Sequence, residues 1–184
     1  MSTPLVLASG SPRRREILQR AGIDHVVDPA GTDESIVGGE EPKAYARRVA
    51  AEKLAVVVGR HPGSDVLAAD TVVDLDGAVL GQPVDDADAR RMLVMLSGRT
   101  HSVHTAVAAM VGGETRTLTV TSRVSFRGLG AARIDWYVGT GEPRGKAGGY
   151  AVQGLGVALV AGVAGSLSNV IGLPVPQTLR LIGR

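Results

Sequence analysis

Short apolar runs and longer amphipathic stretches follow one another along this chain. Residues 5–8 (Leu-Val-Leu-Ala) and 66–73 are apolar runs of the length and composition typical of buried strands. Residues 13–21 and 42–59 instead repeat their apolar positions at helical spacing, which predicts helices with one inward face. Such an alternation of strand and helix is typical of an α/β protein.

The remaining pattern extends this alternation to the end of the chain. Further strands are expected at residues 25–30, 78–80, 102–111, 115–126 and 157–163, and further helices at residues 85–96, 131–138 and 175–182. Residues 31–41 (acidic) and 139–149 (glycine-rich) lack a regular pattern and are predicted to be loops. The chain has 184 residues and no linker-like tract, so we expect one domain, residues 1–184.

Residues 7–15, Leu-Ala-Ser-Gly-Ser-Pro-Arg-Arg-Arg, join the first predicted strand to the first predicted helix. Ser11 is expected to be the N-cap and Pro12 the first helical residue. Arg13, Arg14 and Arg15 then lie at the positive end of the helix dipole, where acidic side chains are preferred. An external anion would relieve this conflict. The pattern therefore predicts either a polyphosphate site or a solvated cluster of arginines.

Two charged residues fall on faces that are otherwise apolar. In the strand expected at residues 66–73, side chains alternate between two faces, and Asp70 lies on a face with apolar neighbours. In the helix expected at residues 42–59, Lys53 lies near the middle of the apolar half. A buried carboxylate needs a partner, a metal or a raised pKa, which favours a functional role for Asp70 over an acid satisfied by backbone amides. For Lys53 the pattern agrees equally well with two interpretations. It has a functional role, or it has none and its ammonium extends past the helix edge to solvent.

Composition narrows the possible functions. The chain has no cysteine, which excludes disulfides, thiolate metal sites and cysteine nucleophiles. Its net charge is +2 and its aromatic residues are few (Phe 1, Trp 1, Tyr 3), so nucleic-acid binding on a stacking platform is not expected. Because neither a signal-peptide pattern nor an apolar span of membrane length is present, we expect a cytoplasmic protein without a membrane partner.

The acidic residues are unevenly distributed, and most of them precede residue 89. Carboxylate ligands for a metal are therefore expected from the first half of the chain. The loop at residues 31–41 offers Asp33 and Glu34, oxygen ligands of the kind that Mg²⁺ takes together with substrate phosphates. Acidic loops are common, so this loop alone does not establish a metal site.

Motifs along almost the whole chain resemble the Maf family, septum-formation inhibitors that act as nucleoside triphosphate pyrophosphatases. In family order, the matching segments are Leu7-Ala8-Ser9-Gly10-Ser11-Pro12-Arg13-Arg14, Asp33-Glu34, Lys53, Ala69-Asp70-Thr71-Val72-Val73, Leu96-Ser97-Gly98-Arg99-Thr100-His101, Gly141-Glu142-Pro143, Lys146-Ala147-Gly148, Val152-Gln153-Gly154 and Asn169-Val170-Ile171-Gly172-Leu173-Pro174. This resemblance implies an elongated α/β fold of the ITPase/Maf-like kind. In such a fold a long mixed sheet is flanked by helices, and a nucleotide cleft lies between two lobes.

The resemblance also implies a reaction, the hydrolysis of a nucleoside triphosphate to the monophosphate and pyrophosphate with a divalent metal (Mg²⁺, Mn²⁺ or Co²⁺). It assigns catalysis to Asp70, Glu34 and Lys53, with Glu34 and Asp70 as the metal ligands. The substrate-binding positions that it implies are Ser9, Ser11, Arg13, Arg14, Thr71, Gln82 and Gln153. Thr71 is similar to the subgroup that prefers dTTP and UTP, whereas a second subgroup carries glutamine there and prefers a methylated guanosine triphosphate. A homodimer is also implied.

Three positions depart from the family pattern. Gln82 replaces the lysine of a Gly-Lys-Pro motif, Gly145 replaces the usual aspartate before Lys146, and Leu167 replaces a common aromatic residue. The neutral amide of Gln82 lacks roughly half the strength of a charge-assisted contact with phosphate. The rate of the implied hydrolysis and its range of substrates therefore stay open. Two alternatives remain: a regulator with division-machinery contacts that binds nucleotide with little turnover, and a pyrophosphatase for deaminated purine nucleotides such as ITP.

Overall fold

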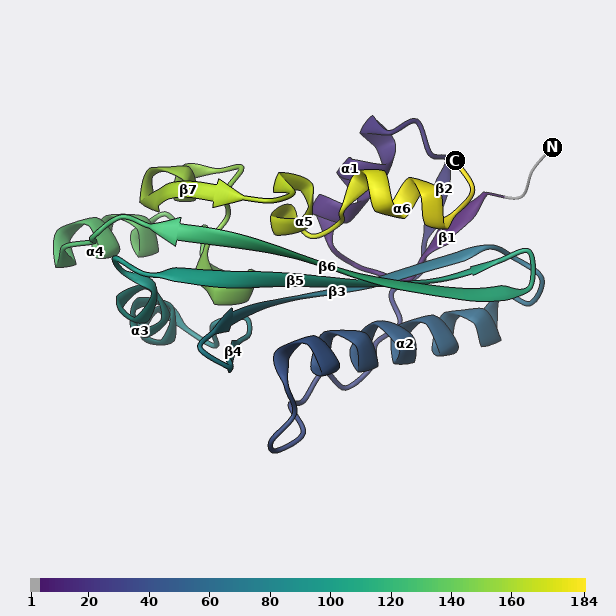
Figure 1. Cartoon of the computed structure of the whole chain (residues 1–184), viewed down its shortest axis with the longest axis horizontal. Helices are drawn as coiled ribbons and strands as arrows, with labels where there is room; N and C mark the ends of the chain where they lie inside the picture. The colour runs from purple at the N-terminus through teal and green to yellow at the C-terminus, as the bar shows by residue number, and fades with distance from the viewer. Residues whose placement is uncertain (1–3) are drawn as a thin grey trace.

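A computed structural model describes residues 4–184 as a mixed seven-stranded sheet flanked by helices (Figure 1). The elements are β1 (Leu5–Leu7), α1 (Pro12–Arg20), β2 (His25–Val27), α2 (Pro42–Arg60), β3 (Val66–Leu75), β4 (Ala78–Leu80), α3 (Asp86–Leu96), β5 (Thr100–Val111), β6 (Glu114–Phe126), α4 (Ala131–Gly139), η1 (Ala147–Gly149), η2 (Leu155–Leu159), β7 (Val160–Ala164), α5 (Leu167–Ile171) and α6 (Val175–Leu181). The strand order is β2-β1-β3-β5-β6-β7, with β4 paired to β3. The predicted α/β class is confirmed.

The long strands β3, β5 and β6 run through the whole molecule and connect two ends with separate apolar cores (Figure 1). At one end, α2 packs on one face of the sheet against β3 and β5, while α1 and α6 pack on the other. At the opposite end, α3 and α4 surround a third cluster that contains Tyr137 and Phe126. The molecule is therefore elongated, as the resemblance implies, and its two ends share one sheet.

One edge of β3 is interrupted halfway along its length. β1 runs parallel to β3 and pairs with it as far as Leu67, whereas β4 runs antiparallel and pairs with residues 73–75. The carboxyl ends of β1 and β4 therefore point toward each other along the same edge. Within residues 4–184, no strand pairs with residues 69–72 of β3 on that side. This interrupted edge leaves room for side chains and loops from both ends of the molecule.

Polar residues cross the sheet at the same level. Thr71 is paired in register with Thr105 of β5, and the Oγ1 atoms of the two side chains lie 3.0 Å apart. On the opposite face, His104 Nε2 lies 3.0 Å from Asp74 Oδ2, and His104 Nδ1 lies 2.8 Å from Thr121 Oγ1. These polar side chains form a band across the middle of the sheet, in which Val72, paired with His104, is a buried apolar member.

Several boundaries differ from those expected from the sequence. The strand predicted at residues 25–30 ends at Val27, close to Pro29, because a proline cannot donate a ladder hydrogen bond. The strand predicted at residues 157–163 is displaced to Val160–Ala164, because the amides of Leu155 and Gly156 bond to a carboxylate and form the turn η2 instead. Neither η1 nor α5 was predicted. Among residues 4–184, no helix has both the length and the apolar character needed to cross a membrane.

The short helix α5 is fastened to the sheet by Asn169, which is fully buried. Its Nδ2 atom donates to the Val103 carbonyl oxygen and to Ser122 Oγ, each at 3.0 Å. We expect Asn169→Ala to lower the free energy of unfolding by about 2–3 kcal/mol, because buried acceptors lose their donor and a void opens. Denaturant unfolding measures the change, with Gln19→Ala on the exposed side of α1 as control. A loss below about 0.5 kcal/mol, the usual size for a surface change, would contradict this prediction.

Candidate active site

A cleft of about 690 Å³ opens at the interrupted edge of β3. Its walls come from both ends of the molecule: the loop after β1, the loop at residues 31–36 and α2 on one side, and the loops after β4 and before η2 on the other. Every site residue predicted from the sequence lines it, namely Ser9, Ser11, Arg13, Arg14, Glu34, Lys53, Asp70, Thr71, Gln82 and Gln153. The structure thus brings together residues that are up to 144 positions apart in the chain.

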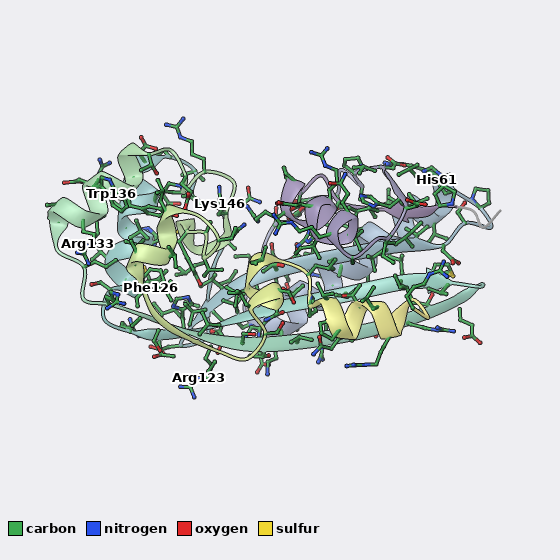
Figure 2. The ribbon with its side chains drawn as sticks, turned by 90° about the horizontal axis from the view of Figure 1, so that it is seen from above. His61, Arg123, Phe126, Arg133, Trp136 and Lys146 are labelled. Carbon is green, nitrogen blue, oxygen red and sulfur yellow. The ribbon has the colours of Figure 1, made fainter. Side chains whose placement is uncertain are left out.

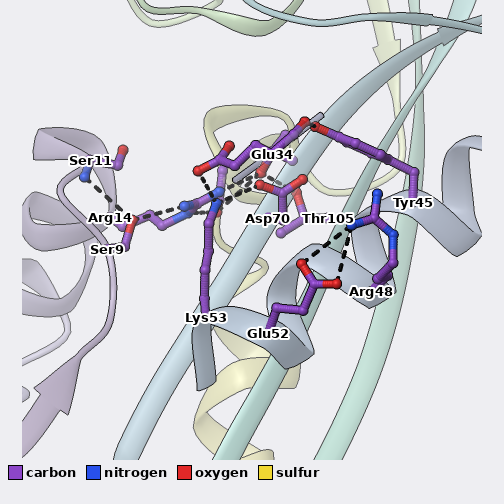
Figure 3. Close-up of polar contacts among 12 residues, drawn as sticks. Ser9, Ser11, Arg14, Glu34, Tyr45, Arg48, Glu52, Lys53, Asp70 and Thr105 are labelled. Carbon is purple, nitrogen blue, oxygen red and sulfur yellow. Dashed lines mark hydrogen bonds and ion pairs between the residues drawn. The ribbon is translucent and has the colours of Figure 1, made fainter. Parts of the chain in front are cut away.

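The centre of the cleft holds a buried lysine between two carboxylates (Figure 3). Lys53 Nζ lies 2.9 Å from Asp70 Oδ1 and 2.8 Å from Glu34 Oε1. The side chains of Lys53 and Asp70 are only 9% and 8% exposed, whereas that of Glu34 is 46% exposed. The two inward charges singled out in the sequence are therefore partners, and the solvated-lysine interpretation is wrong.

The charge state of Asp70 is set by competing effects. Burial raises the pKa of its carboxyl group above the ordinary value, because the charged form loses its hydration. The Lys53 ammonium and the Arg14 guanidinium act in the opposite direction, and the net pKa remains raised. A carboxylate with a raised pKa, facing a cleft and paired with cations, has the properties of a group that accepts a proton during a reaction.

Adjacent arginines of α1 have different surroundings. Arg14 is buried and its guanidinium is used within the protein: Nε donates to the Gly172 carbonyl oxygen at 2.9 Å, Nη1 to Ser9 Oγ at 2.8 Å, and Nη2 to Thr71 Oγ1 at 3.0 Å. Arg13 donates through Nε to the Ile171 carbonyl oxygen at 3.3 Å. Among residues 4–184, no hydrogen-bond partner is found for the terminal amino groups of Arg13. Arg14 therefore orders the cleft wall, while Arg13 offers donors to a ligand.

The start of α1 differs in detail from the sequence expectation. Ser11 is the N-cap residue and Pro12 the first helical residue, as predicted. The Ser11 side chain makes no capping bond; its backbone amide instead donates to Ser9 Oγ at 3.3 Å. The first turn contains no acidic side chain. The positive end of α1 and Arg13 consequently face the cleft without an internal carboxylate from this turn to balance them.

The loop that carries Glu34 is held by α2. Tyr45 Oη donates to the Glu34 carbonyl oxygen at 2.9 Å, and Arg48 Nη2 donates to the Ser35 carbonyl oxygen at 3.0 Å. Burial raises the pKa of Tyr45 to about 12, and the nearby carboxylates of Asp70 and Glu34 add to this effect, so its hydroxyl stays a donor at neutral pH. These contacts explain why one acidic side chain of an irregular loop has a fixed place beside Lys53.

Lys146 is a cleft residue that we did not single out for the site, although it lies in a family-like segment. It comes from the opposite wall and, in Figure 2, lies on the side of its end that faces α1, whereas Arg133 and Trp136 lie farther out. Burial lowers the pKa of its ammonium, and the positive charge of Arg13 lowers it further. The effect of Arg13 on Lys146 means that cations from both walls approach the same part of the cleft. Three lysines in the chain were too few to form a recognisable pattern.

The carboxylates beside Lys53 also fit a divalent cation. Glu34 and Asp70 present hard oxygen atoms to one shared cation, the Lys53 ammonium, and the three charges together leave one net negative charge. Within residues 4–184, no group of three or more His, Asp or Glu side chains is placed to hold a metal. Such a pair suits Mg²⁺ or a similar ion, which takes one or two carboxylates and completes its shell with water and substrate phosphates.

Fold and site together define a class of protein: an α/β protein with a cation-lined cleft for a phosphate-bearing ligand, and a buried carboxylate, Asp70, at its centre. The sequence model of the family described as Maf-like protein matches residues 4–184, and the chain belongs to this family.

Relatives match over nearly the full length. A protein of Myxococcus xanthus (strain DK1622) named dTTP/UTP pyrophosphatase is 52% identical over 99% of this chain and 92% of its own length. A protein of Symbiobacterium thermophilum with the same name is 45% identical over 97% of this chain and 92% of its own length. Among solved structures, the Staphylococcus aureus Ham1 protein has a TM-score of 0.41 at 15% identity, over 67% of this chain and 72% of that one. A likeness of that size carries no functional argument.

Proposed function

We propose that this protein hydrolyses dTTP and UTP to the nucleoside monophosphate and pyrophosphate. The observation that carries the proposal is the buried Asp70–Lys53 pair, joined by the more exposed Glu34, at the centre of a cation-lined cleft. The full-length relatives of this chain are named for this activity. Such a cleft provides what phosphoanhydride hydrolysis requires: a base for the attacking water, and positive charge for the departing pyrophosphate.

In the proposed reaction, water attacks the α-phosphorus and the bond from that phosphorus to the bridging oxygen breaks. The proton of the water passes to Asp70, whose raised pKa makes it a better acceptor than an exposed aspartate. The electron pair of the broken bond leaves with pyrophosphate. Arg13 and Lys146 stabilise the charge that grows there, and Lys53 fixes the Asp70 carboxylate by the 2.9 Å contact.

Glu34 and Asp70 would hold the divalent metal, for which Mg²⁺, Mn²⁺ and Co²⁺ are the candidates. When bound, such an ion acts as a Lewis acid on phosphate oxygens. Ser9, Ser11 and Gln82 lie near the ends of β1 and β4 and are assigned to phosphate contacts, whereas Gln153 is assigned to a contact with the rest of the nucleotide. Arg14 and Thr71 act mainly by ordering the wall that joins Ser9 to Gly172.

The experiment is pyrophosphate release from dTTP, UTP, the other canonical triphosphates, ITP and a methylated guanosine triphosphate, each with Mg²⁺, Mn²⁺ or Co²⁺. Catalytic release from dTTP and UTP supports the proposal. Preferred release from ITP supports the alternative pyrophosphatase for deaminated nucleotides. Binding of dTTP without turnover under every metal supports the alternative regulator of cell division.

Gln82 gives a separate prediction about rate. Gln82→Lys restores a positive charge at the end of β4 in the cleft, so we expect KM for UTP to fall about tenfold, the value of one charge-assisted contact of roughly 1.4 kcal/mol. The effect should shrink at high ionic strength, because salt screens exposed charges. Gln19→Lys on the exposed side of α1, away from the cleft, is the control. An unchanged KM at low salt would mean that position 82 does not face the phosphates.

Four expectations from the sequence stay predictions: the homodimer, the contacts with the division machinery, the cytoplasmic location and the single-domain organisation. Size-exclusion chromatography with light scattering tests the first of these.

A further inference from the structure

Gln153 is presented to the cleft by a segment without regular strand structure, residues 150–154, between η1 and η2. Tyr150, Ala151 and Val152 are buried, whereas Gln153 is exposed. An irregular segment of this kind has no ladder of hydrogen bonds to fix it. Tyr150 and Val152 anchor it in the apolar core, and its backbone amides need partners from elsewhere in the protein.

Two side chains from α4 and the turn after it provide those bonds. Tyr137 is fully buried; its hydroxyl donates to Glu142 Oε1 at 2.8 Å and accepts from the Ala151 amide at 3.1 Å. The Glu142 carboxylate in turn accepts from the Leu155 amide through Oε2 and from the Gly156 amide through Oε1, both at 2.9 Å. The amides held in this way lie two residues before Gln153 and two and three residues after it.

The two glycines of the segment fit this arrangement closely. A Cβ atom at position 154 would lie 2.3 Å from Glu142 Oε2, and one at position 156 would lie 2.5 Å from the Ala151 carbonyl oxygen. Burial alone would raise the pKa of Glu142, but the amides of Gly156 and Leu155 lower it below its ordinary value. Glu142 therefore accepts these bonds as a carboxylate at neutral pH.

We propose that Tyr137 and Glu142 are positioning residues that clamp the segment on both sides of Gln153 and so set where Gln153 meets the substrate. Neither residue lines the cleft, so each acts through the backbone that it holds. The inference rests on the proposed function only for the identity of the ligand, since the clamp itself is a property of residues 137–156. Its effect is on the binding of nucleotide more than on the reacting phosphate.

The clamp is tested first without any ligand, by hydrogen exchange of individual amides. In Tyr137→Phe the Ala151 amide, and in Glu142→Gln the Leu155 and Gly156 amides, should exchange about tenfold faster or more, while amides in the middle of β5 keep their rates. Gly154→Ala should reproduce the Glu142→Gln pattern. Gly162→Ala, where a Cβ meets nothing within 4 Å, is the matched control. Unchanged exchange at all three amides overturns the clamp.

The second test measures coupling to Gln153 with UTP as substrate. Tyr137→Phe should raise KM about tenfold and change kcat less than about threefold, because the phosphate-binding side is untouched. Gln153→Ala should raise KM similarly, and the double variant should be no worse than Gln153→Ala alone. Additive losses, or a loss confined to kcat, overturn the positioning role. If the unmodified protein releases no pyrophosphate, the proposed function fails, but the exchange experiment and the same cycle measured by UTP binding still decide the inference.

Discussion

Asp70→Asn is expected to remove most of the turnover, with pyrophosphate release falling by about 10²–10⁴-fold, the usual range for loss of a general base. The amide is the same size, and its oxygen can still accept from Lys53, so the fold and the phosphate-binding groups remain in place. It has no basic site for the proton of the attacking water. Binding of UTP should therefore weaken by less than about tenfold, because the loss falls on the transition state.

Asp74→Asn provides the matched control for this experiment. Asp74 lies on the same strand and the same face as Asp70, but it bonds to His104 and does not line the cleft. We expect its variant to keep turnover within about twofold, the range of surface changes. Steady-state release assays with dTTP and UTP measure both variants. Near-normal turnover by Asp70→Asn would remove Asp70 from the mechanism and leave Glu34 as the candidate base.

Lys53→Met is expected to shift the pH dependence of the reaction as well as its rate. Burial already raises the pKa of Asp70, and Lys53 is the strongest opposing influence, so removing the ammonium raises that pKa further. Asp70 accepts a proton only when ionised, and ionisation requires a pH above its pKa. The acid limb of the profile of kcat/KM should therefore move to higher pH, and turnover at neutral pH should fall by about 10²-fold.

Lys43→Met is the corresponding control, because Lys43 is an exposed lysine in the first turn of the same helix. Methionine retains most of the lysine stem, so the packing of residue 53 against the sheet is preserved. Thermal unfolding should be recorded alongside the kinetics, since Asp70 loses its closest cation in Lys53→Met. An acid limb at the same pH in Lys53→Met and the unmodified protein would show that Asp70 ionisation does not limit the reaction.

The sequence predicted the catalytic pair because each residue breaks a periodic pattern. Asp70 is polar on an apolar strand face and Lys53 is polar on an apolar helix face, and the spacing of apolar residues along the chain is enough to reveal both. This spacing does not reveal which residues contact each other. That Lys53 contacts Asp70 depends on the packing of α2 against β3, and that Glu34 joins them depends on Tyr45 and on bonds from Arg48 to the loop.

Other features have no local signal. Arg13 and Arg14 both donate through Nε to carbonyl oxygens 158 positions away, those of Ile171 and Gly172. Arg14 alone is buried and also bonds to Ser9 and Thr71, and no local pattern distinguishes it from Arg13. The helix α5 has five residues, too few to show a helical period, although Ser166 caps it by accepting from the Asn169 amide. The bonds of Tyr137 and Glu142 run to backbone amides, which every residue has, so no side-chain pattern marks their partners.

The polar band across the middle of the sheet has a mechanical consequence. Apolar packing resists deformation because interlocked side chains have few alternative arrangements, and each end of this molecule has its own packed core. At the level of Thr71, Thr105 and His104, Val72 is the apolar member of a row whose other side chains form hydrogen bonds, and the geometry of such bonds tolerates small rotations. We expect the sheet to bend more readily at this level than at either apolar core. Since the cleft opens at that level, bending the sheet changes the distance between the walls while both cores stay intact.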